Sequence, residues 1–184
     1  MSRIIAGKHR GRRLSIPKGR DIRPTTDRMR ERLFSMLTHS RYPDLHGAYV
    51  ADLFAGTGAL GLEALSRGAA HVSFVEKAPT SIATIKDNVA SLKAEKEVKI
   101  LKNSATALPK ATQAYDFIFM DPPYRQGLVE PTLLSIISGE WLAENGVIIC
   151  ELAVDDPLNL PTELEIIDER SQGQQRVLFL NFRE

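Results

Sequence analysis

The feature that most constrains the fold of this chain is an alternation of short apolar runs with helix-compatible segments after residue 48. Residues 49–54 form an apolar run, a helical segment follows at about 58–67, and a second apolar run occupies 71–76. Pro79 suits the first turn of the next helix. The later apolar runs are 98–101, 117–120 and 147–152, with a further helix near 133–137. This alternation predicts an α/β fold with a mostly parallel, doubly wound sheet.

The N-terminal part departs from the alternation. Residues 3–16 predict a short basic hairpin, and a helix is expected to begin at Thr26 or Asp27 and to end near 39–40. The apolar face of this helix comprises Met29, Leu33, Met36 and Leu37, and the arginines expected largely off that face are Arg28, Arg30 and Arg32. We therefore expect a basic N-terminal extension over 1–41, followed by the α/β domain over 42–184.

The C-terminal part departs from it too. Residues 163–168 and 176–182 flank the turn-forming segment 171–174, which predicts an antiparallel hairpin at one edge of the sheet.

Charge is distributed unevenly along the chain. Residues 1–41 contain twelve Lys and Arg but only three Asp and Glu, a net charge of +9, whereas the whole chain carries +1. Ten of the twelve bases are arginine, which suits bidentate phosphate contacts and stacking on bases. This asymmetry favours a nucleic-acid partner over a solvated arm without a specific partner. The candidate RNA contacts are Arg10, Arg12, Arg13, Arg23, Arg28 and Arg30.

Several classes of protein are disfavoured. No stretch approaches the ~20 apolar residues of a membrane span, and the start lacks the apolar region of a secretory signal. The single cysteine, Cys150, lies in an apolar run and is expected to be a small core residue, so no disulfide within the chain is expected. The four histidines are scattered, so no metal is expected. We expect a cytoplasmic protein without membrane contact.

Asp121-Pro122-Pro123-Tyr124 follows one apolar run directly. Neither proline can donate to a β-ladder and each fixes its own φ, so the strand ends in a stiff loop. That loop holds a carboxylate and an aromatic ring at the carboxyl edge of the sheet, where open α/β sheets bind ligands. A carboxylate can accept a hydrogen bond from an exocyclic amine, and a tyrosine can stack on the base. The alternative is an ordinary turn after a strand.

A glycine-rich loop joins the first strand to the first helix. Gly56, Gly58 and Gly61 form a G-x-G-x-x-G pattern, and Glu76 ends the second strand at the distance expected for an acid that binds ribose hydroxyls. The pattern alone fits NAD, S-adenosylmethionine or a structural turn. Asp52 favours S-adenosylmethionine, because its carboxylate would repel a pyrophosphate and suit a cationic amine and sulfonium. Asp52, Glu76 and Asp121 would then converge on one edge.

With these motifs the chain resembles the class I S-adenosylmethionine-dependent amino-methyltransferases. More closely, it is similar to the bacterial 16S ribosomal RNA guanine-N2 methyltransferase family that modifies guanine 966. The segments that carry the resemblance are 3–7, 11–14, 23–31, 52–64, 75–77 and 121–124, and the N-terminal ones are the most specific. The resemblance implies a Rossmann-like seven-stranded sheet.

The resemblance also implies roles for residues. The cofactor contacts would be Thr26, Asp52, Phe54, Ala55, Gly56, Thr57, Gly58, Glu76 and Lys77. The loop Asp121, Pro122, Pro123 and Tyr124 would hold the target amine. Many relatives of this class have an acid near the adenine, where this chain has Asn103 and Ser104, which can still hydrogen-bond an adenine. The segment around 23–30 would contribute to the methionyl side and to RNA.

The function expected is therefore methyl transfer to the N2 amine of a guanine in 16S rRNA, in the 30S subunit or an assembly intermediate, by a monomer. A DNA adenine-N6 methyltransferase would use the same Asp-Pro-Pro-Tyr chemistry, although 184 residues leave little room for a DNA-recognition domain. A protein amide methyltransferase, a non-catalytic RNA-binding or assembly protein on this fold, and an NAD oxidoreductase are further alternatives.

Overall fold

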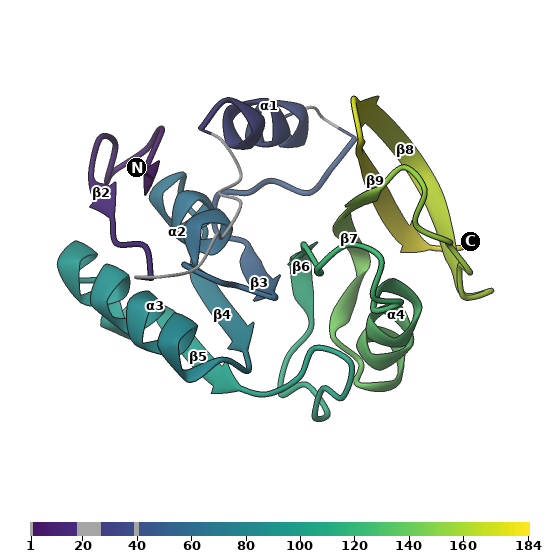
Figure 1. Cartoon of the computed structure of the whole chain (residues 1–184). Helices are drawn as coiled ribbons and strands as arrows, with labels where there is room; N and C mark the ends of the chain where they lie inside the picture. Colours follow the sequence, from purple (N-terminus) through teal and green to yellow (C-terminus); the bar gives the residue numbers. More distant parts are fainter. Residues whose placement is uncertain (1, 18–26, 39–40) are drawn as a thin grey trace.

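The computed structural model describes residues 2–17, 27–38 and 41–184. A seven-stranded sheet with the order β5-β4-β3-β6-β7-β9-β8 forms the centre of the molecule, and β1 and β2 form a separate two-stranded sheet (Figure 1). The strands are β1 (Ser2–Arg3), β2 (Arg13–Leu14), β3 (Tyr49–Leu53), β4 (His71–Glu76), β5 (Val98–Lys102), β6 (Tyr115–Met120), β7 (Leu142–Ala153), β8 (Leu164–Gln172) and β9 (Gln175–Phe182). The helices are α1 (Asp27–Leu37), α2 (Ala59–Ser66), α3 (Pro79–Leu92) and α4 (Val129–Ser138), with a short 3-10 turn at Glu95–Glu97.

The expected mostly parallel sheet is confirmed. Strands β3 to β7 pair in parallel, whereas β9 pairs antiparallel with both β7 and β8. The predicted C-terminal hairpin is therefore β8–β9, at one edge. Strand β7 begins earlier than its apolar run, because a polar segment around Glu144 extends the pairing through a bulge.

The helices cover both faces of the sheet, as a doubly wound fold requires. Alternate strand residues point to opposite faces, so Phe119 packs in one core with α1, α2 and α3, and Ile118 packs in a second core with α4. Cys150 is fully buried in the second core, where burial raises the pKa of its thiol, as expected for a small core residue. No helix in the described ranges is long and apolar enough to cross a membrane.

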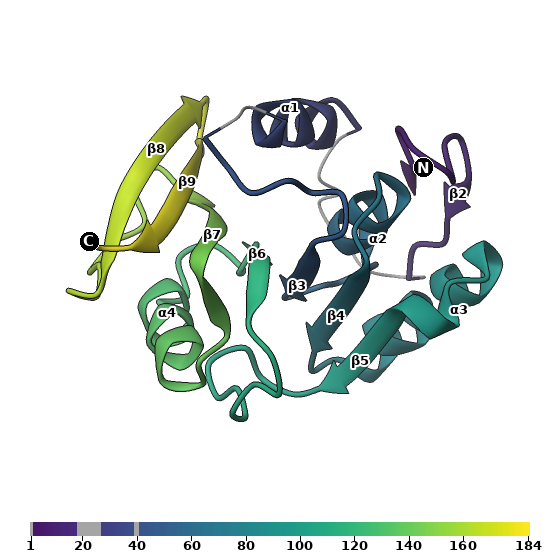
Figure 2. The same cartoon turned by 180° about the vertical axis from the view of Figure 1, so that it is seen from behind.

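The N-terminal hairpin packs beside α2, and the β8–β9 hairpin lies on the other side of the molecule, with α1 between them (Figures 1 and 2). Ile4 and Leu14 of the hairpin join the same core as α2. The carboxylate of Glu63 in α2 accepts hydrogen bonds from the backbone amides of Ile5 (2.8 Å) and Ala6 (3.0 Å), which fixes the hairpin to the sheet domain.

One expectation about α1 is wrong. The residues of this helix that the structure buries are Arg30, Phe34 and Leu37. Arg30 is fully buried, and its guanidinium donates to the carboxylate of Asp27 (2.7 Å) and the carbonyl oxygen of Arg3 (2.8 Å). Arg30 thus links α1 to the hairpin and presents no surface to RNA. Of the predicted apolar face, Leu37 is buried, whereas Met29, Leu33 and Met36 are only partly buried and line a cavity.

Candidate active site

The acidic residues predicted at three strand ends are brought together. Asp52 near the end of β3, Glu76 at the end of β4 and Asp121 after β6 all line one cavity of about 870 Å³. The strands are parallel neighbours, so their carboxyl ends meet at the same edge of the sheet. The glycine-rich loop that follows β3 forms another wall of this cavity, which we call the cofactor cavity.

Asp52 is the most perturbed acid of the cofactor cavity. It is 2% exposed, and its carboxylate accepts a hydrogen bond from the backbone amide of Gly61 (2.9 Å). Burial raises the pKa of Asp52 to about 8; the Gly61 amide opposes that shift and the charge of Glu76 adds to it. Gly61 must be a glycine, because a Cβ there would lie 2.5 Å from the ring of Phe74. A cationic group in the cavity would favour the ionised form of Asp52.

Glu76 is held by the backbone around it. One carboxylate oxygen accepts from the amide of Gly56 (2.9 Å), and the other from the amides of Lys77 (2.8 Å) and Ala78 (2.9 Å). These bonds join the glycine-rich loop to the start of α3 and fix the carboxylate at the cavity wall. Carboxylate oxygens have further lone pairs, so Glu76 can still accept from hydroxyl groups of a ligand.

The remaining predicted cofactor residues lie around the same space. The other residues of this set that line the cofactor cavity are Phe54, Ala55, Gly56, Thr57, Lys77, Asn103 and Ser104. Gly58 is buried behind them, beside the ring of Phe74. Asn103 accepts from the amide of Ser104 (2.8 Å), and the Ser104 hydroxyl lies 2.9 Å from that of Thr106, so this corner is polar without an acid. Thr26 lies outside the described residues.

The Asp121–Tyr124 loop follows β6, the strand that pairs with β3. The whole loop lines the cavity, with Pro122 buried and Pro123 exposed. The hydroxyl of Tyr124 donates to a carboxylate oxygen of Glu151 on β7 (2.5 Å), and the side-chain amide of Gln175 on β9 donates to that same oxygen (3.0 Å). Burial and the bond to Glu151 raise the pKa of Tyr124. The ring is therefore held from two strands.

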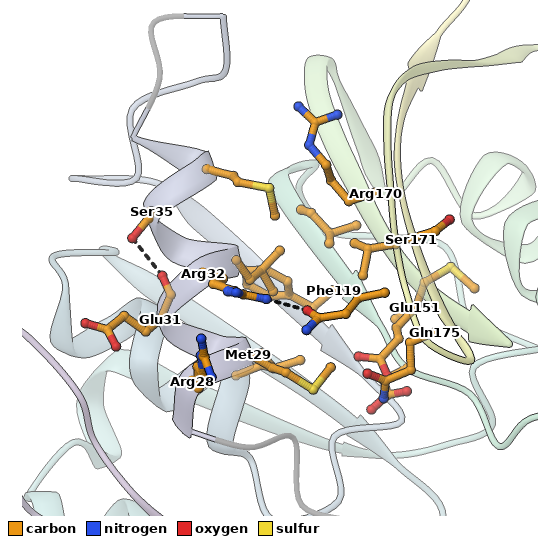
Figure 3. Close-up of a pocket in the computed structure, with 18 residues that line it drawn as sticks. Arg28, Met29, Glu31, Arg32, Ser35, Phe119, Glu151, Arg170, Ser171 and Gln175 are labelled. Carbon is orange, nitrogen blue, oxygen red and sulfur yellow. Dashed lines mark hydrogen bonds between the residues drawn. The ribbon is translucent and has the colours of Figure 1, made fainter. Parts of the chain in front are cut away.

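A second cavity, of about 590 Å³, adjoins the first. It lies between α1 and the tip of the β8–β9 hairpin, and we call it the acceptor cavity (Figure 3). Apolar side chains such as Leu33, Phe119 and Ile149 form much of its lining. The residues that line both cavities are Met29, Leu60, Asp121, Glu151 and Gln175. The two spaces therefore meet beside Asp121.

The candidate RNA contacts separate into groups. Arg10, Arg12 and Arg13 are exposed on the N-terminal hairpin, and Arg28 is exposed at the acceptor cavity. Arg30 is buried, as described above, and Arg23 lies outside the described residues.

Comparisons with known proteins agree with this arrangement. The family model described as "Conserved hypothetical protein 95" matches residues 2–181. The chain belongs to this family. One member, Ribosomal RNA small subunit methyltransferase D of Escherichia coli (strain K12), is 38% identical over 173 residues, which cover 94% of this chain and 85% of that one. The Haemophilus influenzae protein of the same name is 36% identical over 175 residues, 93% of this chain and 89% of that one.

Solved structures show the same fold. The structure of yhhF from Escherichia coli has a TM-score of 0.83 and 34% identity, and the match covers 98% of this chain and 97% of that one. A putative methylase from Haemophilus influenzae has a TM-score of 0.81 and 33% identity, over 99% and 98% of the two chains. The resemblance to a 16S rRNA methyltransferase family and the Rossmann-like class I methyltransferase fold are thereby confirmed.

Two side chains that line both cavities, Glu151 and Gln175, were not among the residues predicted from the sequence. Glu151 is a lone charged residue near the end of the apolar run 147–152, so the sequence carried a local signal for it. Gln175 carries no comparable signal, because it begins a hairpin strand whose pairing with β7 is long-range. Among the residues that the structure describes, no cluster of His, Cys, Asp and Glu could hold a metal ion.

Proposed function

We propose that this protein transfers a methyl group from S-adenosylmethionine to the exocyclic N2 amine of a guanine in 16S rRNA, at guanine 966 by family resemblance. The single observation that carries the proposal is the meeting of the cofactor cavity and the acceptor cavity at Asp121. Family membership supports it, since relatives are named as ribosomal RNA small subunit methyltransferases.

The side chains around the cofactor cavity fit S-adenosylmethionine. Two acids, Asp52 and Glu76, face it, whereas a pyrophosphate would need positive groups or free amides in their place. A buried carboxylate with a raised pKa is an acceptor that a cationic amine or sulfonium would satisfy. Asn103 and Ser104 are the proposed contacts to the adenine. When bound, S-adenosylmethionine supplies a methyl group that the sulfonium has already activated.

The residues of the Asp121–Tyr124 loop would then orient the amine. The lone pair of the guanine N2 is delocalised into the ring, so the amine is a poor nucleophile. The carboxylate of Asp121 and the carbonyl oxygen of Pro122 each accept one N–H, which aims the lone pair at the methyl carbon. Tyr124 stacks on the base, a contact worth ~1–3 kcal/mol. Orientation of this kind supplies much of the rate when the donor is already reactive.

The N-terminal extension, 1–41, would serve the RNA. Arg10, Arg12 and Arg13 are exposed on one hairpin and suit phosphate contacts. Arg23 and Thr26 remain proposed contacts to RNA and cofactor. The base must be flipped out or lie in a single-stranded loop to reach the site. We further propose that the protein acts in the cytoplasm as a monomer, on the 30S subunit or an assembly intermediate.

The proposal is tested by changing Asp121. Asp121→Ala should lower methyl transfer to small ribosomal subunits by about 100-fold or more, the cost of lost orientation, while S-adenosylmethionine still binds at the far side of the cofactor cavity. Methyl transfer is measured with tritiated S-adenosylmethionine, and binding by calorimetry. Asp87→Ala, on an exposed position of α3, is the matched control. Turnover retained in Asp121→Ala would remove Asp121 from the mechanism.

A further inference from the structure

Glu151 lies beside Asp121 at the junction of the two cavities. Met120 of β6 pairs with Cys150 of β7 in parallel register, so Asp121 and Glu151 are the next residues of adjacent strands. Because side chains alternate along a strand, both point to the face that carries Phe119 and Ile149, and those two residues line the acceptor cavity. The site thus holds two neighbouring carboxylates.

The two oxygens of Glu151 have different surroundings. Oε1 accepts from the hydroxyl of Tyr124 (2.5 Å) and from Nε2 of Gln175 (3.0 Å), which fixes the orientation of the carboxylate. Among residues 2–17, 27–38 and 41–184, the hydrogen bonds to this carboxylate go to Oε1 and none goes to Oε2. Figure 3 shows Glu151 and Gln175 together at one side of the acceptor cavity, with Met29 of α1 facing them. An acceptor oxygen is therefore held ready next to the residue that would bind the amine.

An acceptor at this place distinguishes the bases. The N2 amine of guanine is flanked by N1–H, which is a donor. The N6 amine of adenine is flanked by N1 and the N4 amine of cytosine by N3, and both of these ring nitrogens are acceptors. A carboxylate beside the amine-binding residue can pair only with the guanine arrangement. With adenine or cytosine two acceptors would face each other without a proton, and such unpaired polar groups give strong rejection.

We infer that Glu151 is the residue that determines base specificity, with Oε2 accepting N1–H of guanine while Asp121 holds the N2 amine. This inference rests on the proposed function and deepens it. It also assigns a role to the C-terminal hairpin, because Gln175 of β9 fixes the carboxylate of Glu151. Tyr124, Glu151 and Gln175 then form one unit that sets both the plane of the base and its identity.

The geometry predicts the effect of Glu151→Gln. Tyr124 and Gln175 both donate to the position of Oε1, so the amide oxygen of the new side chain stays there. Its NH₂ group then takes the place of Oε2 and offers a donor instead of an acceptor. The base that matches this new donor is 2-aminopurine, which keeps an amine at C2 but has an unprotonated N1 that can accept a hydrogen bond.

The test measures kcat/KM for methyl transfer to reconstituted small subunits. Their 16S rRNA carries either guanine or 2-aminopurine at the nucleotide that receives the methyl group. The wild type should prefer guanine by about 100-fold or more, within the range for lost polar complementarity. In Glu151→Gln that ratio should fall at least about tenfold, by a lower rate on guanine and a higher rate on 2-aminopurine. The two bases differ in intrinsic reactivity, but this difference affects the wild type and Glu151→Gln equally. It therefore cancels when the guanine to 2-aminopurine ratios of the two proteins are compared.

Glu144→Gln, an exposed position on the same strand, is the matched control and should leave the ratio unchanged. Thermal unfolding and cofactor binding are measured on all three proteins. An unchanged ratio in Glu151→Gln, or an equal loss on both substrates, would overturn the inference while the proposed function stands. A wild type that binds S-adenosylmethionine but labels no guanine would instead overturn the proposed function.

Discussion

At the scale of single residues, Asp52 makes the stability of the protein depend on pH, because its carboxyl group is buried in the wall of the cofactor cavity. Its pKa is raised from 3.8 to about 8 by burial, so between these values the folded protein holds a proton that the unfolded chain has lost. The free energy of unfolding therefore falls as the pH rises through that window. A side chain of similar shape that cannot lose a proton would remove this pH dependence of the free energy of unfolding.

Asp52→Asn should accordingly gain stability relative to the wild type as the pH rises from 5 to 8, because asparagine can still accept from the Gly61 amide. The measurement is thermal unfolding of both proteins across this range without cofactor. Saturating S-adenosylmethionine should stabilise the wild type more at pH 8 than at pH 5. A difference in melting temperature that is independent of pH would contradict the raised pKa.

Which site residues the sequence could predict depends on how local their signal is. Asp52, Glu76 and Asp121 were predictable because each lies near the end of an apolar run or directly after it, and the carboxyl ends of parallel strands share an edge. The burial of Arg30 was not predictable from the sequence, because contact with the N-terminal hairpin determines which face of α1 is packed. Placing Met29 and Leu33 at a cavity likewise requires the tertiary arrangement.

At the scale of elements, the N-terminal hairpin is docked closely on α2. Besides the bonds to Glu63, the amide of Lys8 donates to the carbonyl oxygen of Ser66 (2.8 Å). The chain approaches α2 so closely that a Cβ at Gly7 would lie 1.7 Å from that oxygen. Gly7 also has a φ of +81°, which disfavours other residues.

Gly7→Ala should therefore destabilise the protein by about 2 kcal/mol or more, roughly 4–8 °C in melting temperature, and weaken RNA binding by displacing the hairpin. Gly11→Ala is the control, since Gly11 has a φ of +80° but nothing near its Cβ position. It carries only the backbone cost of about 1–2 kcal/mol. Equal effects of the two substitutions would contradict the proposed docking contact.

The elements themselves were largely predictable, because strands and helices in this chain have clear periodicity and turn signals. The start of β7 was not predictable, because its first residues include Glu144 and Asn145, which are exposed and polar. Pairing with β6 through a bulge, rather than local preference, extends the strand there.

At the scale of the whole molecule, the charge asymmetry separates a basic N-terminal part, which we propose binds RNA, from an acidic remainder. Replacing Arg10, Arg12 and Arg13 by alanine should weaken RNA binding and reduce the dependence of log K on log salt by roughly 2 units, about 0.7 for each phosphate contact with single-stranded RNA. Binding is measured by salt titration. The control with equal charge loss, Lys86, Lys99 and Lys110 to alanine, should change the slope far less. A slope unaffected by the arginine changes would remove the hairpin from the RNA interface.

The most direct test of the central claim identifies the modified nucleoside. Small ribosomal subunits from a strain that lacks this gene are incubated with the purified protein and tritiated S-adenosylmethionine, and the RNA is then digested to nucleosides. The account predicts labelled N2-methylguanosine from 16S rRNA. Label in N6-methyladenosine, or no label in RNA although the cofactor binds, would contradict it.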